Sequence, residues 1–561
     1  MRLYPWKQHV VAGVVTSAAL AGLLLLLSRI SSASFVPLDI ADAMIRLTPG
    51  AVATFGIETL GSLAKLIIEL TGSLILIIFG GAIGWLYGRI APRPLALAAM
   101  VLAIIPTMLT LLVQSMIGGL RGGVIGFSLT ILAYLGWGGM LAWIINRVTP
   151  STAALLTADP AQETSRRIFL LRSAGTMLAV AVGTTAIAEL LGTNESDTQV
   201  AGAGQALPTS APVQPTAAPA PTSAPTSLPA ATTIANAPTA QPTDVAAPTA
   251  IPEPSATPVP AFAPAPGTRA PFNTNETLYV ISSSTRDPIV ERETWKLMIA
   301  GAVDTPFDIS YNELLAMPRI EQTSTLACIS NEVGNYLIGN VMWTGIRLRD
   351  LLERAGVQDG VIDVKLTAAE GYTESIPLAK AMDPTSIIAY GIGGEALVVK
   401  HGFPARLIVP GLYGVKNVKW LTKIELVRTD YKGYWQQRGW TDDATITTTS
   451  VFDTGNPRLS KEPLRLQQGI VPLGGVAFAG NRGITTVEIR IDDGEWTQTT
   501  LDPQSDPLTW RVWRYNWAAT PGKHTLTLRA VDGTGQPQIE KPRDTHPDGA
   551  TGYHIIMVEV A

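Results

Sequence analysis

Among the side chains that could do chemistry, the most distinctive is Cys328, the only cysteine in 561 residues. One cysteine excludes an intramolecular disulfide, an all-cysteine iron–sulfur cluster and c-type haem attachment, which needs two cysteines. Any redox cofactor bound through cysteine must therefore require only one thiolate ligand. A lone cysteine among apolar residues can also be a buried small hydrophobe. Its neighbours favour a role for Cys328 in ligand binding. Asn331, Gly334 and Gly339 are residue types that allow tight backbone turns near a ligand, and Trp343 could provide a flat aromatic wall.

A second cluster lies in the segment HGFPARLIVPGLYGVKNVKW, residues 401–420. Arg406, Lys416 and Lys419 lie close to two glycines in a loop that follows an apolar strand. Backbone NH groups and basic side chains in such a loop suit a bound phosphate. The spacing matches neither a P-loop nor a dinucleotide fingerprint. The alternative is a solvated basic loop.

The size and composition of the chain indicate several domains, one of them in a membrane. A chain of 561 residues exceeds one hydrophobic core. Its mean hydropathy of +0.24, with 15% charged residues, is too apolar for an ordinary soluble protein. The formal net charge of −4 gives no reason to expect nucleic acid as a partner.

The apolar excess lies in residues 1–192, for which we expect a membrane domain of about five helices. Each apolar stretch is near the ~20 residues that span a bilayer. The stretches are Val10–Leu27, Leu66–Tyr87, Leu95–Ile117, Val124–Ile145 and Ala174–Leu191. Arg89, Arg93 and Arg147 favour a cytoplasmic location for both ends of the first four spans.

The fifth stretch follows a twin-arginine-like segment at residues 165–172, which begins SRRIFL. Twin-arginine signals are read by an export system that carries folded, often cofactor-loaded proteins. The alternative is that Arg166 and Arg167 only mark the cytoplasmic end of a helix. Both interpretations place the chain after residue 192 on the extracytoplasmic side of a bacterial cell membrane.

Three regions are expected after the membrane domain. Residues 193–267 are rich in Ala, Pro and Thr and predict a disordered linker. Residues 268–440 alternate strand and helix patterns, with helices at Tyr311–Ala316 and Leu348–Ala355 and strands that include 278–281 and 397–399, which predicts an α+β domain. Residues 441–561 show short strands separated by Asp-Gly turns, which predicts an all-β immunoglobulin-like sandwich.

Both exported domains resemble the sulfite oxidase superfamily of molybdopterin-dependent oxidoreductases. The matching segments in the α+β domain are NETLYV (275–280), LACISNEVG (326–334), MWTGIRLRDLL (342–352), GYTESIPL (371–378) and HGFPARLIVPGLYGVKNVKWL (401–421). In the last domain, GGVAFAGNRGITTVEIRIDDGEW (474–496) and TWRVWRYNW (509–517) are similar to the dimerisation domain of that family, which implies a possible homodimer.

The resemblance implies one molybdenum atom bound by a single molybdopterin, with Cys328 as its protein ligand. A soft thiolate suits this metal. The residues implied to hold the pterin and its phosphate are Leu278, Tyr279, His401, Arg406, Asn417, Val418 and Lys419, with Lys416 as a helper. Tyr372 is implied as a catalytic tyrosine that hydrogen-bonds or passes a proton, and a structural tyrosine is the alternative.

The sequence departs from a sulfite oxidase where that family carries cations. Ile281, Ser282 and Ser283 replace an Arg and a His, and Glu332 and Val333 stand where an Arg follows the cysteine. Each lost charge-assisted bond is worth roughly 1.5–3 kcal/mol. The pocket is therefore more similar to the branch with the methionine sulfoxide reductase subunit, although Ser330 replaces the glutamate of that branch.

These features predict an extracytoplasmic, membrane-tethered molybdenum oxidoreductase that transfers an oxygen atom to or from a small S- or N-oxide. The alternatives are a sulfite oxidase or dehydrogenase, and a non-catalytic cell-surface binding protein with the same fold. The five histidines provide no pair for haem b in the membrane helices. We therefore expect a separate electron-transfer partner, a cytochrome or a membrane redox protein.

Overall fold

The structure is a computed structural model. It describes residues 6–31, 34–40, 62–89, 94–117, 123–149, 160–203, 262–284, 287–456, 465–503 and 506–561.

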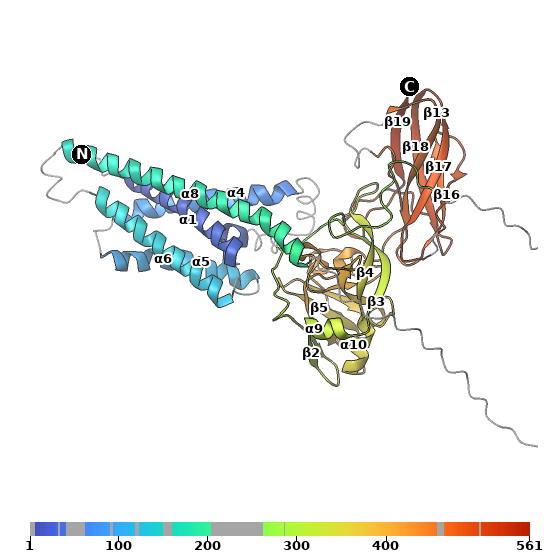
Figure 1. The fold of residues 1–561 in the computed structure, drawn as a ribbon, viewed down its shortest axis with the longest axis horizontal. Coiled ribbons are helices and arrows are strands. Elements are labelled where there is room, and N and C mark those ends of the chain that lie inside the picture. Colours follow the sequence, from blue (N-terminus) through green and yellow to red (C-terminus); the bar gives the residue numbers. More distant parts are fainter. Residues whose placement is uncertain are drawn as a thin grey trace, which may run out of the picture. The chain divides into compact units, whose positions relative to one another are not determined.

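Within the described part of the first 203 residues, five helices are long and apolar enough to cross a membrane. They are α1 (Trp6–Ser31), α4 (Ser62–Tyr87), α5 (Leu95–Ile117), α6 (Gly123–Val148) and α8 (Pro160–Ala203) (Figure 1). The prediction of five apolar helices is confirmed. The last helix continues beyond the expected end at Leu191.

Helix α1 packs against α4, α6 and α8, and α5 packs against α6. Helices α1 and α4 approach closely at Gly13, where an added Cβ would lie 2.1 Å from the carbonyl oxygen of Gly80. Small residues allow such approaches between membrane helices, where van der Waals packing replaces the hydrophobic effect.

The predicted linker of residues 193–267 falls largely on residues 204–261, which lie outside the described residues. Helix α8 covers residues 193–203, which were expected to belong to the linker.

The α+β domain contains two sheets (Figure 1). The first has the strand order β2-β1-β10-β5-β6, and within it only β1 and β10 run parallel. Its strands are β1 (Lys296–Gly301), β2 (Phe307–Ser310), β5 (Asp363–Ala368), β6 (Thr373–Pro377) and β10 (Leu421–Val427).

The second sheet is antiparallel, with the order β3-β4-β7-β8 and with β9 paired to β7. Its strands are β3 (Ile320–Ala327), β4 (Ile338–Arg347), β7 (Ile387–Ile392), β8 (Glu395–Ala396) and β9 (Arg406–Ile408).

Three short helices accompany the sheets, and two of them were predicted with the same bounds. Helix α9 (Tyr311–Ala316) begins with a capping box between Ser310 and Glu313. Helix α10 (Leu348–Ala355) buries Leu and Ala side chains on one face, as its amphipathic pattern requires. The third is α11 (Leu378–Ala381).

Two predicted strands of this domain are wrong. Residues 278–281 are irregular, although Leu278 is buried in the core. Residues 397–399 lead into a 3₁₀ turn, η1 (Val399–His401), which ends at Gly402 with a φ of 106°. Both segments bury apolar residues without pairing in a sheet. A run of apolar residues alone does not distinguish a paired strand from a buried segment of irregular backbone.

The C-terminal region is a pair of sheets with one shared core. The first sheet contains β11 (Thr449–Phe452), β13 (Gly469–Phe478), β17 (Arg511–Ala519) and β16 (Thr500–Leu501), in that order. The second contains β12 (Arg465–Leu466), β19 (His554–Val560), β18 (Gly522–Asp532), β14 (Ile484–Ile491) and β15 (Thr497–Gln498). Leu473 and Trp513 from the first sheet pack with Val487, Leu526 and Ile556 from the second. The sheets therefore form a β-sandwich.

Candidate functional site

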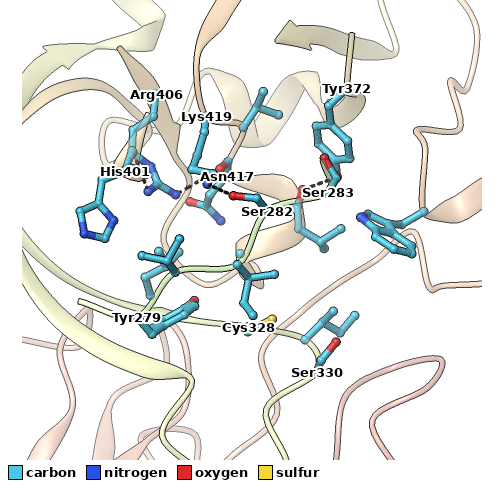
Figure 2. Close-up of a pocket in the computed structure, with 18 of the residues that line it drawn as sticks. Tyr279, Ser282, Ser283, Cys328, Ser330, Tyr372, His401, Arg406, Asn417 and Lys419 are labelled. Atoms are coloured by element: carbon cyan, nitrogen blue, oxygen red, sulfur yellow. Dashed lines mark hydrogen bonds between the residues drawn. The ribbon is translucent and has the colours of Figure 1, made fainter. Parts of the chain in front are cut away.

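A pocket with about 1020 Å³ of empty space, part of it open to solvent, lies at the end of β3. Its walls come from the 279–283 segment, the end of β3, the β5–β6 turn, the 400–420 segment and two tryptophans (Figure 2). Segments far apart in the sequence thus meet around Cys328.

Cys328 follows the last residue of β3, and its side chain is buried while lining the pocket. Its backbone NH donates to the carbonyl of Leu337 at 2.9 Å, and its carbonyl accepts from the NH of Asn331 at 3.1 Å. Burial raises the pKa of the thiol, against weaker opposing hydrogen bonds from Ser330. A bound cation is the interaction that would favour the thiolate here.

The loop after Cys328 is held by a hydrogen bond within the loop and by another from Asn456, in the C-terminal region. Oδ1 of Asn331 accepts from the NH of Leu337 at 2.8 Å, and the side-chain amide of Asn456 donates to the Gly334 carbonyl at 2.7 Å. Gly334 has a φ of +80°, and a Cβ there would lie 2.3 Å from Nε2 of His554. This glycine serves packing against His554, because it does not line the pocket.

Cationic side chains gather on another wall of the pocket. Arg406 is buried, and its guanidinium donates to the carbonyls of His401 at 3.1 Å and Asn417 at 3.2 Å. Nζ of Lys419 donates to Oγ of Ser282 at 2.7 Å (Figure 2). Lys400 also lines this wall.

His401 is neutral in this environment. Burial, together with the positive charge of Arg406, lowers the pKa of His401 to about 3. Its Nε2 lies 2.8 Å from the carbonyl of Asn275, which can only accept, so Nε2 carries the proton. The imidazole therefore contributes Nδ1 as an acceptor and adds no charge.

The residues present fit a molybdopterin phosphate, as judged from Arg406. Burial lowers the pKa of Arg406 to about 10, still protonated at neutral pH. Its Nε has no hydrogen-bond partner, and within the described part of the chain no carboxylate forms an ion pair with it. A buried, uncompensated cation is costly unless an anion completes it. A phosphate at this wall would supply that anion.

The part of the pocket around Tyr372 is aromatic and acidic. Trp435 and Trp440 belong to a series of ring contacts that begins at Tyr372, and the charge of Glu370 acts on Tyr372. The hydroxyl of Tyr372 has two acceptors, Oε2 of Glu374 at 3.1 Å and the Val415 carbonyl at 2.9 Å. Burial, followed by the charge of Glu374, raises the pKa of Tyr372 well above its ordinary value.

The structure brings most of the predicted site residues to this one pocket. Those that line it are Tyr279, Cys328, Tyr372, His401, Arg406, Asn417, Val418 and Lys419. The side chain of Asn417 is used locally, since Oδ1 accepts from the Val409 NH and Nδ2 donates to the Leu412 and Tyr413 carbonyls. The backbone NH of Asn417 donates to the Gly414 carbonyl at 3.0 Å, and its carbonyl accepts from Arg406, so Asn417 shapes this wall through hydrogen bonds within the chain.

Two predicted residues do not line the pocket. Leu278 is buried in the core, and its NH donates to the Thr274 carbonyl. Nζ of Lys416 donates to Glu374, to the Ser375 carbonyl and to Asp442, at 2.9–3.0 Å. An ammonium has three protons, so Lys416 has none left for a phosphate.

The flat wall expected from Trp343 is also placed differently. Trp343 is fully buried in the core, and the guanidinium of Arg406 lies 5.2 Å from its ring centroid. The indole thus stabilises the buried guanidinium through a cation–π contact on the core side. Gly339 lies in β4, where a Cβ would meet Leu278 at 2.6 Å.

Sequence reasoning missed several lining residues, above all Glu370, Trp435 and Trp440. Glu370 precedes the GYTESIPL segment by one residue. The two tryptophans lie in the loop GYWQQRGW after the last strand of the domain. Two large aromatic residues in a loop with glycines could have indicated a pocket wall from the sequence.

Comparisons with known proteins agree on the class. Residues 284–435 match the family described as "Oxidoreductase molybdopterin binding domain". The uncharacterized oxidoreductase YuiH of Bacillus subtilis is 37% identical over 174 residues, which cover 31% of this chain and 86% of YuiH. These matches define the class of protein as a molybdopterin-binding oxidoreductase, whose cofactor is molybdenum bound to molybdopterin.

The chain belongs to the sulfite oxidase superfamily of these enzymes. Mitochondrial sulfite oxidase of Homo sapiens is 28% identical over 291 residues, 44% of this chain and 53% of that protein. The chain thus spans about half the length of this relative. A solved structure, the sulfane dehydrogenase SoxCD from Paracoccus pantotrophus, aligns with a TM-score of 0.46 and 24% identity, covering 52% of this chain and 82% of that chain.

Proposed function

We propose that the chain is an extracytoplasmic, membrane-tethered molybdenum enzyme that removes the oxygen atom from a small S- or N-oxide. The observation that carries this proposal is the makeup of the pocket around Cys328. On the side proposed for the substrate are Ser330 and the aromatic residues Tyr372 and Trp435, with Glu370 as the charged group near Tyr372. A neutral or cationic organic oxide suits these side chains better than an oxyanion does.

Cys328 is the proposed metal ligand, because its soft sulfur lies in the pocket and is the only thiol in the chain. When bound, the molybdenum cofactor supplies two-electron oxygen-atom chemistry. The protein then has to orient the substrate, exclude water and move protons.

Arg406, His401 and Lys419 are proposed to hold the pterin and its phosphate. Arg406 contributes the unpartnered buried Nε, and Lys419 contributes a second positive charge. Tyr279, Asn417 and Val418 complete the wall. Together these groups would hold the anionic end of the cofactor.

Sulfite oxidation is the second candidate function, supported by the relatives named sulfite oxidase. Sulfite is an anion, and a site for it needs cations near the metal. Lys400, Arg406 and Lys419 are the lining cations within the described residues, and all three lie on the proposed pterin wall. Glu370 on the substrate side would repel sulfite.

The proposed location follows from the five apolar helices and from Arg166 and Arg167. The catalytic domain would be exported loaded with its cofactor and would receive electrons from a separate redox protein. The C-terminal sandwich is proposed to be immunoglobulin-like and to support a homodimer. Replacing Arg166 and Arg167 by Lys should block export, while protease added to intact spheroplasts should release the wild-type domain.

The experiment that tests the activity uses the full-length protein made in a molybdopterin-competent bacterium. Molybdenum and pterin are quantified, and turnover of dimethyl or methionine sulfoxide with a reduced dye is compared with turnover of sulfite with a cytochrome acceptor. Sulfoxide turnover with weak sulfite turnover supports the proposal. Faster sulfite turnover selects the second candidate, and wild-type protein without molybdenum makes a non-catalytic binding protein the better interpretation.

A further inference from the structure

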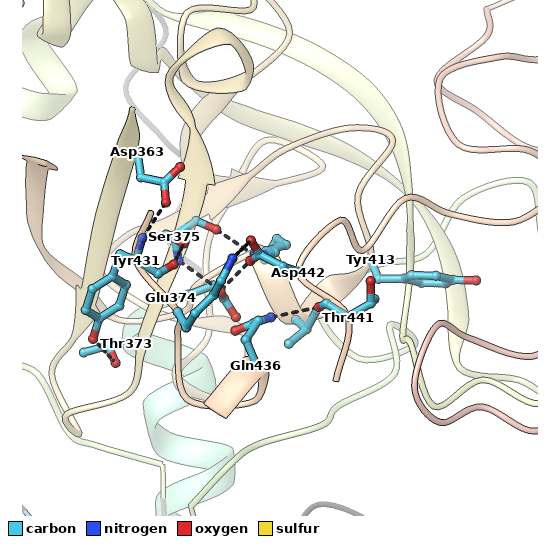
Figure 3. A network of polar contacts seen from close by, with 12 residues as sticks. Asp363, Thr373, Glu374, Ser375, Tyr413, Tyr431, Gln436, Thr441 and Asp442 are labelled. Atoms are coloured by element: carbon cyan, nitrogen blue, oxygen red, sulfur yellow. Dashed lines mark hydrogen bonds and ion pairs between the residues drawn. The ribbon is translucent and has the colours of Figure 1, made fainter. Parts of the chain in front are cut away.

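A continuous run of hydrogen-bonded, ionisable side chains leads away from the pocket. It begins at Tyr372, which lines the pocket, and continues through Glu374 in β6 to Lys416 in the 3₁₀ turn η2 (Gly414–Lys416). It ends at Asp442, whose side chain is 39% exposed (Figure 3). The side chains of Glu374 and Lys416, by contrast, are 0% and 1% exposed.

Every link of this run is within hydrogen-bond distance. Oη of Tyr372 lies 3.1 Å from Oε2 of Glu374. Nζ of Lys416 lies 3.0 Å from Oε1 of Glu374 and 2.9 Å from Oδ1 of Asp442. Lys432, on the surface, donates to the other carboxylate oxygen of Asp442. The two oxygens of Glu374 therefore have different partners, Oε2 on the side of Tyr372 and Oε1 on the side of Lys416.

We propose that Tyr372, Glu374, Lys416 and Asp442 form the proton path between the active-site pocket and solvent. The inference rests on the proposed function, because reducing an oxide XO to X and water consumes two electrons and two protons. The electrons come from a reduced one-electron carrier, and the protons come from water at Asp442.

The proton balance closes over the four groups. Tyr372 gives its hydroxyl proton to the departing oxygen, and the ammonium of Lys416 protonates the Glu374 carboxylate at Oε1. The protonated carboxyl then turns about its Cγ–Cδ bond and passes this proton to the Tyr372 phenolate, and neutral Lys416 recovers a proton through Asp442 from solvent. Each cycle of hops carries one proton and leaves the four groups unchanged, so two cycles serve one turnover. In the direction of substrate oxidation the same hops run outward.

A purely structural role does not account for this arrangement as well. A buried ion pair contributes little net stability compared with apolar residues of similar volume. This pair also has a tyrosine of the pocket at one end and a solvated carboxylate at the other. Burial raises the pKa of Glu374 against the opposing charge of Lys416, and a raised carboxyl pKa suits a proton carrier.

The charged and titratable groups around Glu374 come from several elements. Tyr372 precedes β6, Lys416 lies in η2, and Asp363 in β5 shares the sheet with Glu374. Asp442 and Lys432 lie at the outer end. Asp363 is buried but accepts from the backbone NH of Tyr431 and lies outside the run of hydrogen bonds from the pocket, which makes it a matched control.

The test compares Glu374→Gln and Asp442→Asn with the control Asp363→Asn in full-length, molybdenum-loaded protein. Glutamine keeps the shape and cannot relay a proton, and Tyr372 keeps the Val415 carbonyl as acceptor. General acid–base groups are worth ~10²–10⁴-fold in rate. We expect Glu374→Gln to lower kcat for oxide reduction by about 10²-fold, with KM and molybdenum content unchanged. The solvent deuterium isotope effect should rise, and a small permeant acid such as imidazolium should restore part of the rate.

A second measurement does not depend on activity. Infrared spectra of the protein, recorded just above the ordinary pKa of glutamate, should contain a protonated carboxyl band that is lost in Glu374→Gln. The rate at which this band shifts in D2O reports access of solvent protons, and it should slow in Asp442→Asn and remain unchanged in Asp363→Asn.

Two results would overturn the path: wild-type kcat and isotope effect in Glu374→Gln, or wild-type exchange of the carboxyl band in Asp442→Asn. Wild-type protein that contains molybdenum and reduces no oxide would overturn the proposed function instead, and the infrared measurement would then decide the path by itself.

Discussion

Nζ of Lys416 lies 3.0 Å from Oε1 of Glu374, and neither side chain is in contact with solvent. Removing one partner of such a pair leaves the other charge buried and uncompensated, at a cost of ~3–5 kcal/mol. We therefore expect Glu374→Ala to lower the free energy of unfolding of the catalytic domain by about that amount. Thermal unfolding followed by circular dichroism measures the loss.

The control for this prediction removes both charges. The double variant Glu374→Leu, Lys416→Met replaces the pair with apolar residues of similar size and should regain most of the lost stability. A double variant as unstable as the single one would show that the hydrogen bonds to Ser375 and Asp442 dominate instead.

Cys328→Ser should abolish molybdenum binding and leave the fold intact. The hydroxyl is a harder, less acidic ligand, and it occupies nearly the same volume in the buried turn. Elemental analysis should find about one molybdenum per chain in the wild type and a small fraction of that in the variant. An unchanged metal content would contradict the assignment of Cys328 as ligand.

Arg406→Gln should weaken retention of the pterin. The variant loses the charge and the unpartnered Nε that we assign to the phosphate, and each charge-assisted bond is worth about 1.5–3 kcal/mol. The pterin content after extensive dialysis should therefore fall at least tenfold. Arg482→Gln, which removes an arginine from the sandwich, is the control and should retain the cofactor.

Local patterns predicted some elements of this fold with their exact bounds. Helix α9 has a complete capping box at Ser310 and Glu313, and α10 has a strongly one-sided apolar face. Each of these signals is local, because the residues that produce it lie within a few positions of one another in the sequence. The irregular backbone at Leu278 could not be predicted in this way, because its burial depends on Leu326 and Trp343 in a distant sheet.

The candidate site likewise contains residues that local sequence motifs predict and residues whose roles depend on distant parts of the chain. Motif resemblance predicted Cys328, His401 and Arg406, which line one pocket, since each lies in a segment with a recognisable order of residues. It misplaced Lys416, whose partner Glu374 is 42 residues away. Charge type alone could not distinguish a phosphate ligand from a buried ion pair, because the difference lies in which carboxylate the fold brings within 3 Å.

Glu370→Gln should shift selectivity toward anionic substrates. The substitution keeps the shape of a side chain that lines the pocket and removes its negative charge. A charge several ångströms from the substrate, at an effective dielectric constant of ~20, is worth roughly 1–2 kcal/mol. We expect the KM for sulfite to fall about tenfold while the KM for a neutral sulfoxide changes little. Equal changes for both substrates would place Glu370 away from the substrate.

The β-sandwich should lose stability in acid through Asp532. Burial by itself raises the pKa of this carboxyl, but hydrogen bonds from Thr534, Arg482 and the Gln536 NH lower it to about 2, from an ordinary 3.8. Between these values the unfolded chain binds more protons than the folded one, so stability rises with pH and is lost as the pH falls from 3.8 to about 2. Amide exchange in the β14–β18 pair, corrected for intrinsic rates, should accelerate over this window. Asp532→Asn should reduce the pH dependence to the part that Asp492 contributes, because the pKa of Asp492 is also lowered, whereas Asp363→Asn, in the catalytic domain, should leave it in place.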